Sequence, residues 1–239
     1  RSLQPHLPPF EYLKSKCIKL SVGEEVNLSQ LSLKLSECGY KKSNNIDQEG
    51  TWTRRGDIID IYPVSSELPI RLELFGDHLE KIKEFDPISQ RSLDKIDKVC
   101  ITPTGFEPLI INKLKSINDK DISTLFSDEE YSELVNSDTL SSARKYLGVA
   151  FDKPSSLLNY LDHNTFIVVD ERLQSLSHGK AWFNIVSENY IELINKSNES
   201  KLLKEIFKPN LHININDIFN ILNNYKGIDI TDLEDTNSK

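Results

Sequence analysis

The residues with the clearest potential for chemistry are Asp170 and Glu171, which directly follow the apolar run Phe166–Val169. A hydrophobic strand that ends in two carboxylates can hold a magnesium ion and an attacking water beside a nucleotide, as in a Walker B element. That chemistry also requires a loop of the form G-x-x-x-x-G-K-[ST], whose amides and lysine bind the phosphates. The sequence contains no such loop. We therefore predict that the acidic pair is vestigial or caps the following helix.

The other reactive side chains form no catalytic or metal-binding pattern in the sequence. The five histidines lack metal-ligand spacing, and the three cysteines are widely spaced without a C-x-x-C pair. Asp57 and Asp60 are three residues apart on an expected strand, which directs them to opposite faces. We expect no catalytic residue, no metal and no cofactor in this chain. The histidines and cysteines are His6, His78, His163, His178, His212, Cys17, Cys38 and Cys100.

Two expected strands, 51–62 and 70–75, carry side chains suited to recognition of another molecule. The first must end at Pro63, because proline has no N–H for a sheet, and the second ends at a Gly-Asp turn. Arginine side chains form planar, permanently charged forks that pair with carboxylates, and aromatic rings add apolar contacts at interfaces. We therefore predict a recognition surface built from Trp52, Arg54, Arg55, Arg71 and Glu73.

Composition and charge restrict the class of partner. The chain has 239 residues, 38% of them hydrophobic, which is enough for two modest cores. Its net charge is -8, with 15 basic against 16 acidic side chains in residues 1–105 and 14 against 21 in 106–239. The acidic second half would repel a phosphate backbone, so we expect a protein partner. The apolar runs are too short to span a bilayer, which predicts a cytoplasmic protein without a membrane partner.

We predict an α+β fold with two domains, 1–105 and 106–239. In the first domain, Asn27 precedes leucines at helical spacing and Gly39 follows them, which indicates a short amphipathic helix. Four short strands follow, so the simplest arrangement is an antiparallel sheet with this helix packed on one face. Their expected ranges are 51–62, 70–75, 79–85 and 96–101.

The second domain is expected to be a helix-rich α/β domain. Its one compact apolar run, 165–169, has no polar alternation, which favours a strand buried on both faces. One strand does not make a sheet, and the sequence begins at Arg1 and contains no Met. We therefore expect the second domain either to need strands from a preceding part of a longer protein or to offer them a docking surface.

Three segments together closely resemble the bacterial transcription-repair coupling factor family. The excision-repair protein UvrB carries a related block, and further matches occur at Gly39-Tyr40 and from Tyr146 to Glu171. The order and spacing of the segments carry the signal, which covers most of the chain. The segments are RGDIIDIYP at 55–63, ELPIRLELFGD at 67–77 and FDPISQRS at 85–92.

The resemblance implies that residues 1–105 are a UvrA-binding domain and that 106–239 are the second portion of a degenerate, RecA-like helicase domain. It implies a non-catalytic fragment that recruits UvrA to RNA polymerase stalled at a lesion. In this family an ATP-driven translocase motor, the RNA polymerase contacts and the DNA contacts belong to other domains. The UvrA-binding surface is also covered by the family's own C-terminal region, which implies an intramolecular partner.

The resemblance also points to individual residues. UvrB contacts UvrA through basic and acidic side chains on adjacent strands, and one position differs here. Thr53 stands where UvrB has a second arginine, and the extra charge falls on Arg54. Adjacent residues on a strand point to opposite faces, so Arg54 is not an equivalent replacement. The positions that match are Arg55, Arg71, Glu73 and Lys41.

Three other hypotheses are open at this point. The chain could be a fragment of a UvrB-like, ATP-dependent DNA helicase in which Asp170 and Glu171 are catalytic. It could bind DNA directly through Arg54 and Arg55, in which case its affinity would fall steeply with salt. Finally, Arg71 and Glu73 lie two residues apart on one strand face, so they could pair with neighbours across the sheet and serve only structure.

Overall fold

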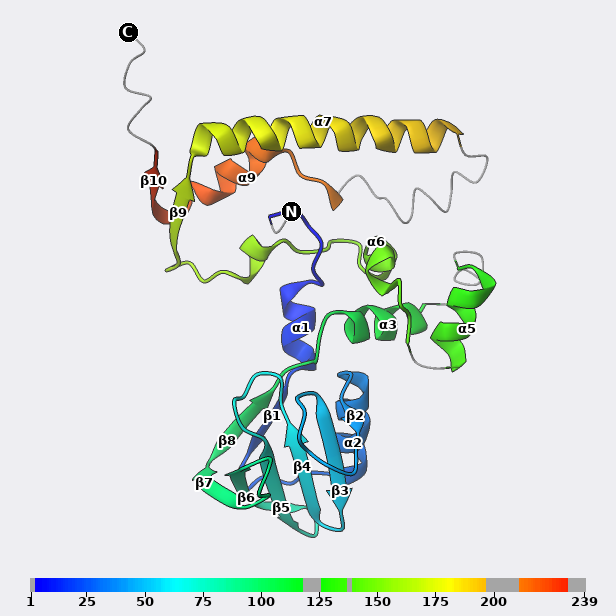
Figure 1. Ribbon diagram of the computed structural model, residues 1–239, viewed down its shortest axis with the longest axis vertical. Helices are drawn as coiled ribbons and strands as arrows, with labels where there is room; N and C mark the ends of the chain where they lie inside the picture. Colours follow the sequence, from blue (N-terminus) through cyan, green and yellow to red (C-terminus); the bar gives the residue numbers. More distant parts are fainter. Residues whose placement is uncertain (1–2, 118–125, 137–138, 197–210, 232–239) are drawn as a thin grey trace. The chain divides into compact units, whose positions relative to one another are not determined.

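The computed structural model describes residues 3–117, 126–136, 139–196 and 211–231 (Figure 1). The chain divides into two compact units. We call residues 11–144 the sheet unit, and residues 1–10 together with 145–239 the α7 unit. The domain division expected after residue 105 remains a prediction.

The sheet unit is built mainly from strands. Helix α1 (Phe10–Lys16) leads into it, and helices α3 and α5 follow its strands. The elements are β1 (Ile18–Ser21), α2 (Leu28–Glu37), β2 (Lys41–Lys42), β3 (Thr51–Arg55), β4 (Ile58–Tyr62), β5 (Ile70–Phe75), β6 (His78–Phe85), β7 (Ser92–Ile96), β8 (Lys98–Ile101), α3 (Glu107–Lys115) and α5 (Asp128–Asn136).

Six strands form one sheet in the order β2-β3-β4-β5-β6-β7. Strands β3 to β7 are antiparallel to their neighbours, as predicted, whereas the two-residue β2 runs parallel to β3. The expected strand 51–62 is in fact two strands, because Gly56, with φ of 62°, turns the chain between β3 and β4. The expected strand 96–101 is also divided, and β8 pairs with β1 in a separate antiparallel pair.

The predicted amphipathic helix is confirmed as α2. Its N-terminus is capped by the Asn27 side chain, which accepts a hydrogen bond from the Gln30 N–H at 2.9 Å. It ends at Glu37, two residues before Gly39, whose φ of 87° lies in the left-handed region. Figure 1 shows α2 beside the strands of the sheet. The helix buries Leu28, Leu31 and Leu35 in one core cluster with Ile59, Ile61 and Leu72 of the sheet.

The α7 unit combines helices with a two-stranded parallel sheet. The 25-residue helix α7 contacts α9, and Figure 1 shows α9 lying against it. A Cβ at Gly179 of α7 would overlap Ile215 of α9, so the close approach requires glycine there. The elements are α6 (Leu147–Ala150), β9 (Phe166–Asp170), α7 (Arg172–Lys196), α9 (Ile215–Leu222) and β10 (Lys226–Ile230). The two units together confirm the predicted α+β class.

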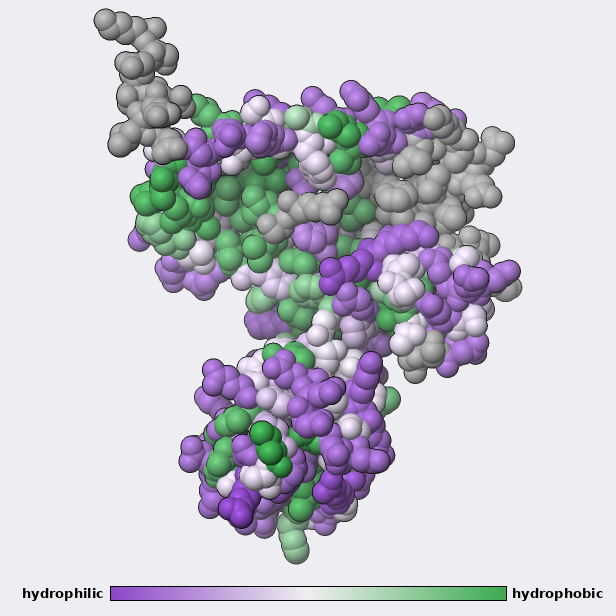
Figure 2. Space-filling view, in the orientation of Figure 1, coloured by the Kyte–Doolittle hydropathy of each residue, from purple (hydrophilic) through white to green (hydrophobic). Residues whose placement is uncertain are grey.

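The expectation that strand 165–169 is buried on both faces is wrong. Strand β9 pairs in parallel with β10, a strand that the sequence analysis did not predict. Ile167 and Val169 pack against the cluster around α9, whereas Phe166 and Val168 on the other face are 58% and 53% exposed. Figure 2 shows apolar side chains gathered over β9 and β10. The apolar run therefore covers a core on one face only.

Candidate protein interface

The predicted recognition residues are positioned by the alternation of side chains in the sheet. Side chains of β4 and β5 that point toward α2, such as Ile59 and Leu72, are fully buried in the core. Their neighbours along each strand point the opposite way, and we call that side the outer face. The register aligns Arg55, Ile58, Glu73 and Lys81 in one row of the outer face. The next row is Thr53, Asp60, Arg71, Lys83 and Lys95.

Arg71 and Asp60 form a bidentate ion pair across β4 and β5. Arg71 Nε lies 2.7 Å from Asp60 Oδ1, and Nη2 lies 2.9 Å from Oδ2. Asp60 is buried, and the Arg71 guanidinium also lies over the ring of the buried Phe85, 4.8 Å from its centroid. The hydrogen bonds that Arg71 donates to Asp60 raise the pKa of Arg71 further, which keeps the fork charged. The structural pairing considered from the sequence is therefore present for Arg71.

Glu73 is also paired within the sheet. Its carboxylate accepts a hydrogen bond from Lys83 Nζ at 2.5 Å and lies 3.9 Å from Lys81 Nζ, both on the adjacent strand β6. Two cations therefore surround one carboxylate. The surroundings of Glu73 are net positive, so Glu73 does not make the outer face acidic.

Arg55 and Lys41 lie on the same outer face and remain exposed. The parallel register places Lys41 beside Thr51, two residues before Thr53 on the outer side of β3. Arg55 Nη2 donates to the Asn44 backbone oxygen at 2.9 Å, which orients the fork without neutralising its charge. Within the described residues, no carboxylate lies within ion-pair distance of Arg55. Arg55 is therefore the arginine of the outer face whose charge is not balanced by a neighbour.

The structure corrects the expected position of Trp52. Its side chain is 5% exposed and belongs to the core, with Lys42 Nζ 5.8 Å from the ring centroid, so it offers no apolar anchor on the outer face. Arg54 is exposed but aligns with the core residue Ile59, on the opposite side of the sheet from Arg55. Of the expected residues, Lys41, Arg55, Arg71 and Glu73 share a face, and Trp52 and Arg54 do not.

The outer face also contains residues that the sequence analysis missed. Lys81 and Lys83 alternate on the expected strand 79–85, so their shared direction was visible in the sequence, but their position beside Glu73 depends on the register of the hairpin. Ile58 and Phe75 extend the face with apolar side chains at the end of the strands, and Phe75 is 76% exposed. The face thus combines excess positive charge with exposed apolar groups.

The acidic pair Asp170-Glu171 lies where β9 ends and α7 begins. Glu171 has a φ of 49°, and its N–H donates to the Ile230 oxygen at 2.8 Å, which links the ends of β9 and β10. Arg172, the next residue, forms an ion pair at 2.6 Å with Asp229 of β10. The acidic partner of Arg172 at this end of the two strands is therefore Asp229. Asp170 is exposed.

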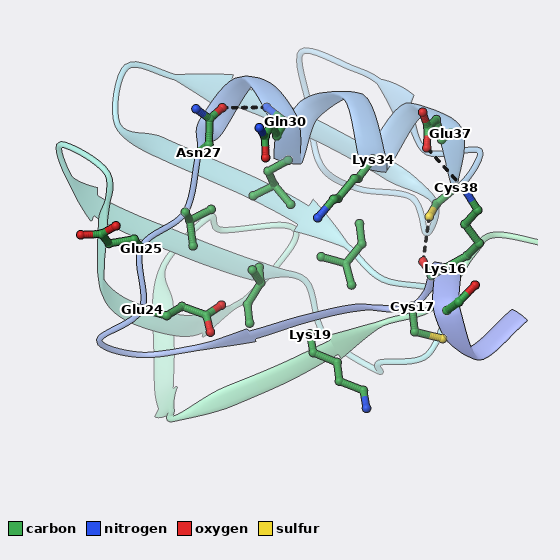
Figure 3. Close-up of a pocket in the computed structure, with 15 residues that line it drawn as sticks. Lys16, Cys17, Lys19, Glu24, Glu25, Asn27, Gln30, Lys34, Glu37 and Cys38 are labelled. Atoms are coloured by element: carbon green, nitrogen blue, oxygen red, sulfur yellow. Dashed lines mark hydrogen bonds and ion pairs between the residues drawn. The ribbon is translucent and has the colours of Figure 1, made fainter. Parts of the chain in front are cut away.

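A cavity of about 400 Å³ lies between α2 and β1 in the sheet unit. Figure 3 shows Lys34 extending from α2 over this cavity, with Lys16 close to Glu37 and Cys38. Its charged lining is balanced, because Lys16, Lys19 and Lys34 face Glu24, Glu25 and Glu37. Burial raises the pKa of the Cys38 thiol to about 11, so this thiol is protonated at neutral pH and is a poor nucleophile. The cavity offers no arrangement that favours covalent catalysis.

Two further observations bear on the class of function. Among the residues that the structure describes, no three His, Cys, Asp or Glu side chains gather in a way that could hold a metal ion. In the same part of the chain, none of the helices is both long and apolar enough to cross a membrane.

Comparison with protein families identifies the segment that carries the outer face. Residues 18–105 match the family described as UvrB interaction domain. This segment is similar to UvrB interaction domains. It begins at β1 and ends just after β8, so every strand of the sheet and the helix α2 belong to it. The outer face is therefore a surface of the segment that matches the UvrB interaction domain.

The chain is similar to curated transcription-repair-coupling factors. It is 33% identical to that of Bacillus subtilis over 185 residues, which are 69% of this chain and 16% of the relative. It is 27% identical to that of Staphylococcus aureus strain USA300 over 213 residues, which are 82% of this chain and 18% of the relative. The chain spans less than a fifth of the length of these relatives. The resemblance expected from the sequence is confirmed, including the UvrB interaction domain.

Proposed function

We propose that this chain is the part of a transcription-repair-coupling factor that binds UvrA through the outer face of its UvrB interaction domain, in transcription-coupled nucleotide excision repair. The proposal rests on the charge of that face within an acidic chain. The face holds six basic side chains against two acidic ones, although the whole chain has a net charge of -8. They are Lys41, Arg55, Arg71, Lys81, Lys83 and Lys95 against Asp60 and Glu73.

Two features make this face suited to a protein partner. Arg55 offers a planar fork whose charge is unbalanced, which favours a bidentate contact with a carboxylate. Ile58, which pairs with Arg55, and Phe75, at the end of β5, supply exposed apolar area, and arginine and aromatic side chains contribute strongly to binding energy at interfaces. Nucleic acid is a less suitable partner, because the exposed apolar groups do not contact phosphates and the chain as a whole is acidic.

The proposed function includes no catalysis by this chain. ATP hydrolysis, RNA polymerase binding and DNA translocation are assigned to other parts of the longer protein, and we propose no cofactor for residues 1–239. The competing hypothesis, a UvrB-like helicase fragment, depends on Asp170 and Glu171 acting on a nucleotide. The sequence lacks the phosphate-binding loop that this chemistry requires.

Calorimetric titration of the chain with purified UvrA tests the proposal. We expect saturable binding that Arg55→Ala weakens by roughly 2 to 4 kcal/mol, because the substitution leaves the partner's carboxylate buried without its charge. Arg54→Ala is the matched control, since it removes the same charge from the adjacent residue on the opposite side of the sheet. We expect the control to bind like the parent chain.

The same titration separates the alternatives. Absence of saturable binding by the parent chain contradicts the proposed function. If Arg54→Ala and Arg55→Ala lose the same amount of affinity for UvrA, binding depends on the general charge of the chain and not on the outer face. Heat from a separate titration with ATP and magnesium, lost in Glu171→Gln, would favour the helicase hypothesis.

A further inference from the structure

The Arg71 fork is used on only one of its edges. Its Nε and Nη2 atoms donate to Asp60, and within the described residues Nη1 donates no hydrogen bond. A guanidinium has five N–H groups in a fixed plane, so an edge formed by Nη1 and Nη2 is left for a second carboxylate. One fifth of the Arg71 side chain remains exposed on the outer face. Arg71 can therefore hold Asp60 and a partner's acid at the same time.

The fork is also held in one orientation by its surroundings. Two hydrogen bonds to a buried carboxylate fix the plane of the guanidinium, and the Phe85 ring lies against it. Phe85 is itself fully buried, so the ring cannot move aside readily. An exposed arginine would lose its side-chain freedom on docking, whereas a fork already held in place loses little. Orientation, rather than extra charge, is what Asp60 provides to the outer face.

We propose that Asp60 is a positioning residue for partner recognition: it presents the free edge of the Arg71 guanidinium to an acidic side chain of the partner. This inference rests on the proposed function, because the partner in question is UvrA. It assigns a binding role to a buried carboxylate that cannot itself touch the partner. It also identifies the recognised chemistry as a carboxylate that shares Arg71 with Asp60.

Asp60→Asn tests the inference in the intact chain. The amide keeps the size of the side chain and one acceptor oxygen, but its NH₂ group opposes one guanidinium N–H and breaks the bidentate pair. We expect the affinity for UvrA to fall roughly tenfold although Arg71 keeps its charge. Asp94→Asn on β7 is the matched control, since it makes the same substitution and charge change at an exposed residue, and we expect unchanged affinity.

A readout on Arg71 separates positioning from a general effect on the fold. We expect the Arg71 Nε–Hε signal in NMR spectra to shift toward solvent-exposed arginine values in Asp60→Asn and to stay in place in Asp94→Asn. In an Arg71→Gln background, whose amide can still donate to Asp60, we expect Asp60→Asn to change the UvrA affinity by less than about twofold. If Asp60→Asn lowers the UvrA affinity equally in the parent chain and in the Arg71→Gln variant, Asp60 does not act through Arg71.

The outcomes distinguish this inference from the proposed function. Failure of the parent chain to bind UvrA contradicts both. Binding by the parent with unchanged affinity in folded Asp60→Asn overturns only the inference. If Asp60→Asn does not fold, Arg71→Lys replaces it, because lysine keeps the charge but has no fork. A tenfold loss in Arg71→Lys supports the inference, and parental affinity overturns it.

Discussion

At the scale of single residues, the outer face holds one arginine that the fold itself requires and one that it does not. Asp60 is buried, and a buried carboxylate without a partner costs several kcal/mol. Its pairing with Arg71 is therefore first a requirement for folding. Folding does not require the charge of Arg55 in this way, because its guanidinium donates only to a backbone oxygen. The same residue type thus has different roles at positions 55 and 71.

This difference predicts opposite results for the same substitution. Arg71→Met leaves Asp60 buried and unpaired, so we expect the free energy of unfolding to fall by about 3 to 5 kcal/mol. Arg55→Met removes an exposed fork, and we expect a change within about 0.5 kcal/mol. Urea denaturation followed by Trp52 fluorescence measures both, since Trp52 lies in the same core.

A compensating variant tests whether the unpaired Asp60 causes the loss of stability in Arg71→Met. When Asp60→Val is added to Arg71→Met, no unpaired charge remains, and we expect most of the lost stability to return. If the double variant is as unstable as Arg71→Met alone, the loss came from packing around Phe85 instead.

At the scale of secondary structure, local signals were sufficient to predict an element. The pairing of strands that are distant in the sequence could not be predicted from them. Helix α2 was predictable because its cap, its leucine spacing and its terminal glycine lie within a few residues of one another. The pairs β1 with β8 and β9 with β10 were missed, because their partners are distant in sequence and two of these strands have no distinctive pattern. The alternation in β3 separated Arg54 from Arg55, but only the core contacts of β4 show which of them faces outward.

The end of α2 gives a prediction at this scale. A Cβ at Gly39 would overlap Thr104 Oγ1 and Pro108, and the left-handed backbone there already disfavours other residues. We expect Gly39→Ala to lower the free energy of unfolding by about 3 kcal/mol. Roughly 1 kcal/mol comes from the left-handed backbone, and the rest comes from overpacking. Urea denaturation measures the loss.

Gly76→Ala is the matched control for Gly39→Ala. Gly76 also has positive φ, but a Cβ there meets nothing within 4 Å. We expect only the backbone cost of about 1 kcal/mol. If Gly39→Ala and Gly76→Ala lower the free energy of unfolding by similar amounts, Thr104 and Pro108 make room for the added Cβ at position 39 without an energetic cost.

At the scale of the whole molecule, each unit holds a hydrophobic cluster of its own. The cluster around α2 and the sheet lies in residues 18–101, and the cluster around α9 belongs to the α7 unit. The sequence contains two tryptophans, and each unit holds one of them. Trp52 lies in the core of the sheet unit, and Trp182 of α7 packs edge-on against His212 with ring centroids 5.6 Å apart. Each unit therefore carries its own fluorescent reporter.

We expect the reporters to show that a change in one cluster leaves the stability of the other unit unaltered, because the two clusters share no residue and need not unfold together. Trp182→Phe leaves Trp52 as the reporter, and Trp52→Phe leaves Trp182 at modest cost, since the Trp52 N–H has no hydrogen-bond partner in the described part of the chain. Gly39→Ala should lower only the urea midpoint reported by Trp52. Gly179→Ala, which would press α7 against Ile215, should lower only the midpoint reported by Trp182. If either substitution shifts both midpoints equally, the chain unfolds as one cooperative body, and binding measurements on the UvrB interaction domain must then be corrected for the stability of the α7 unit.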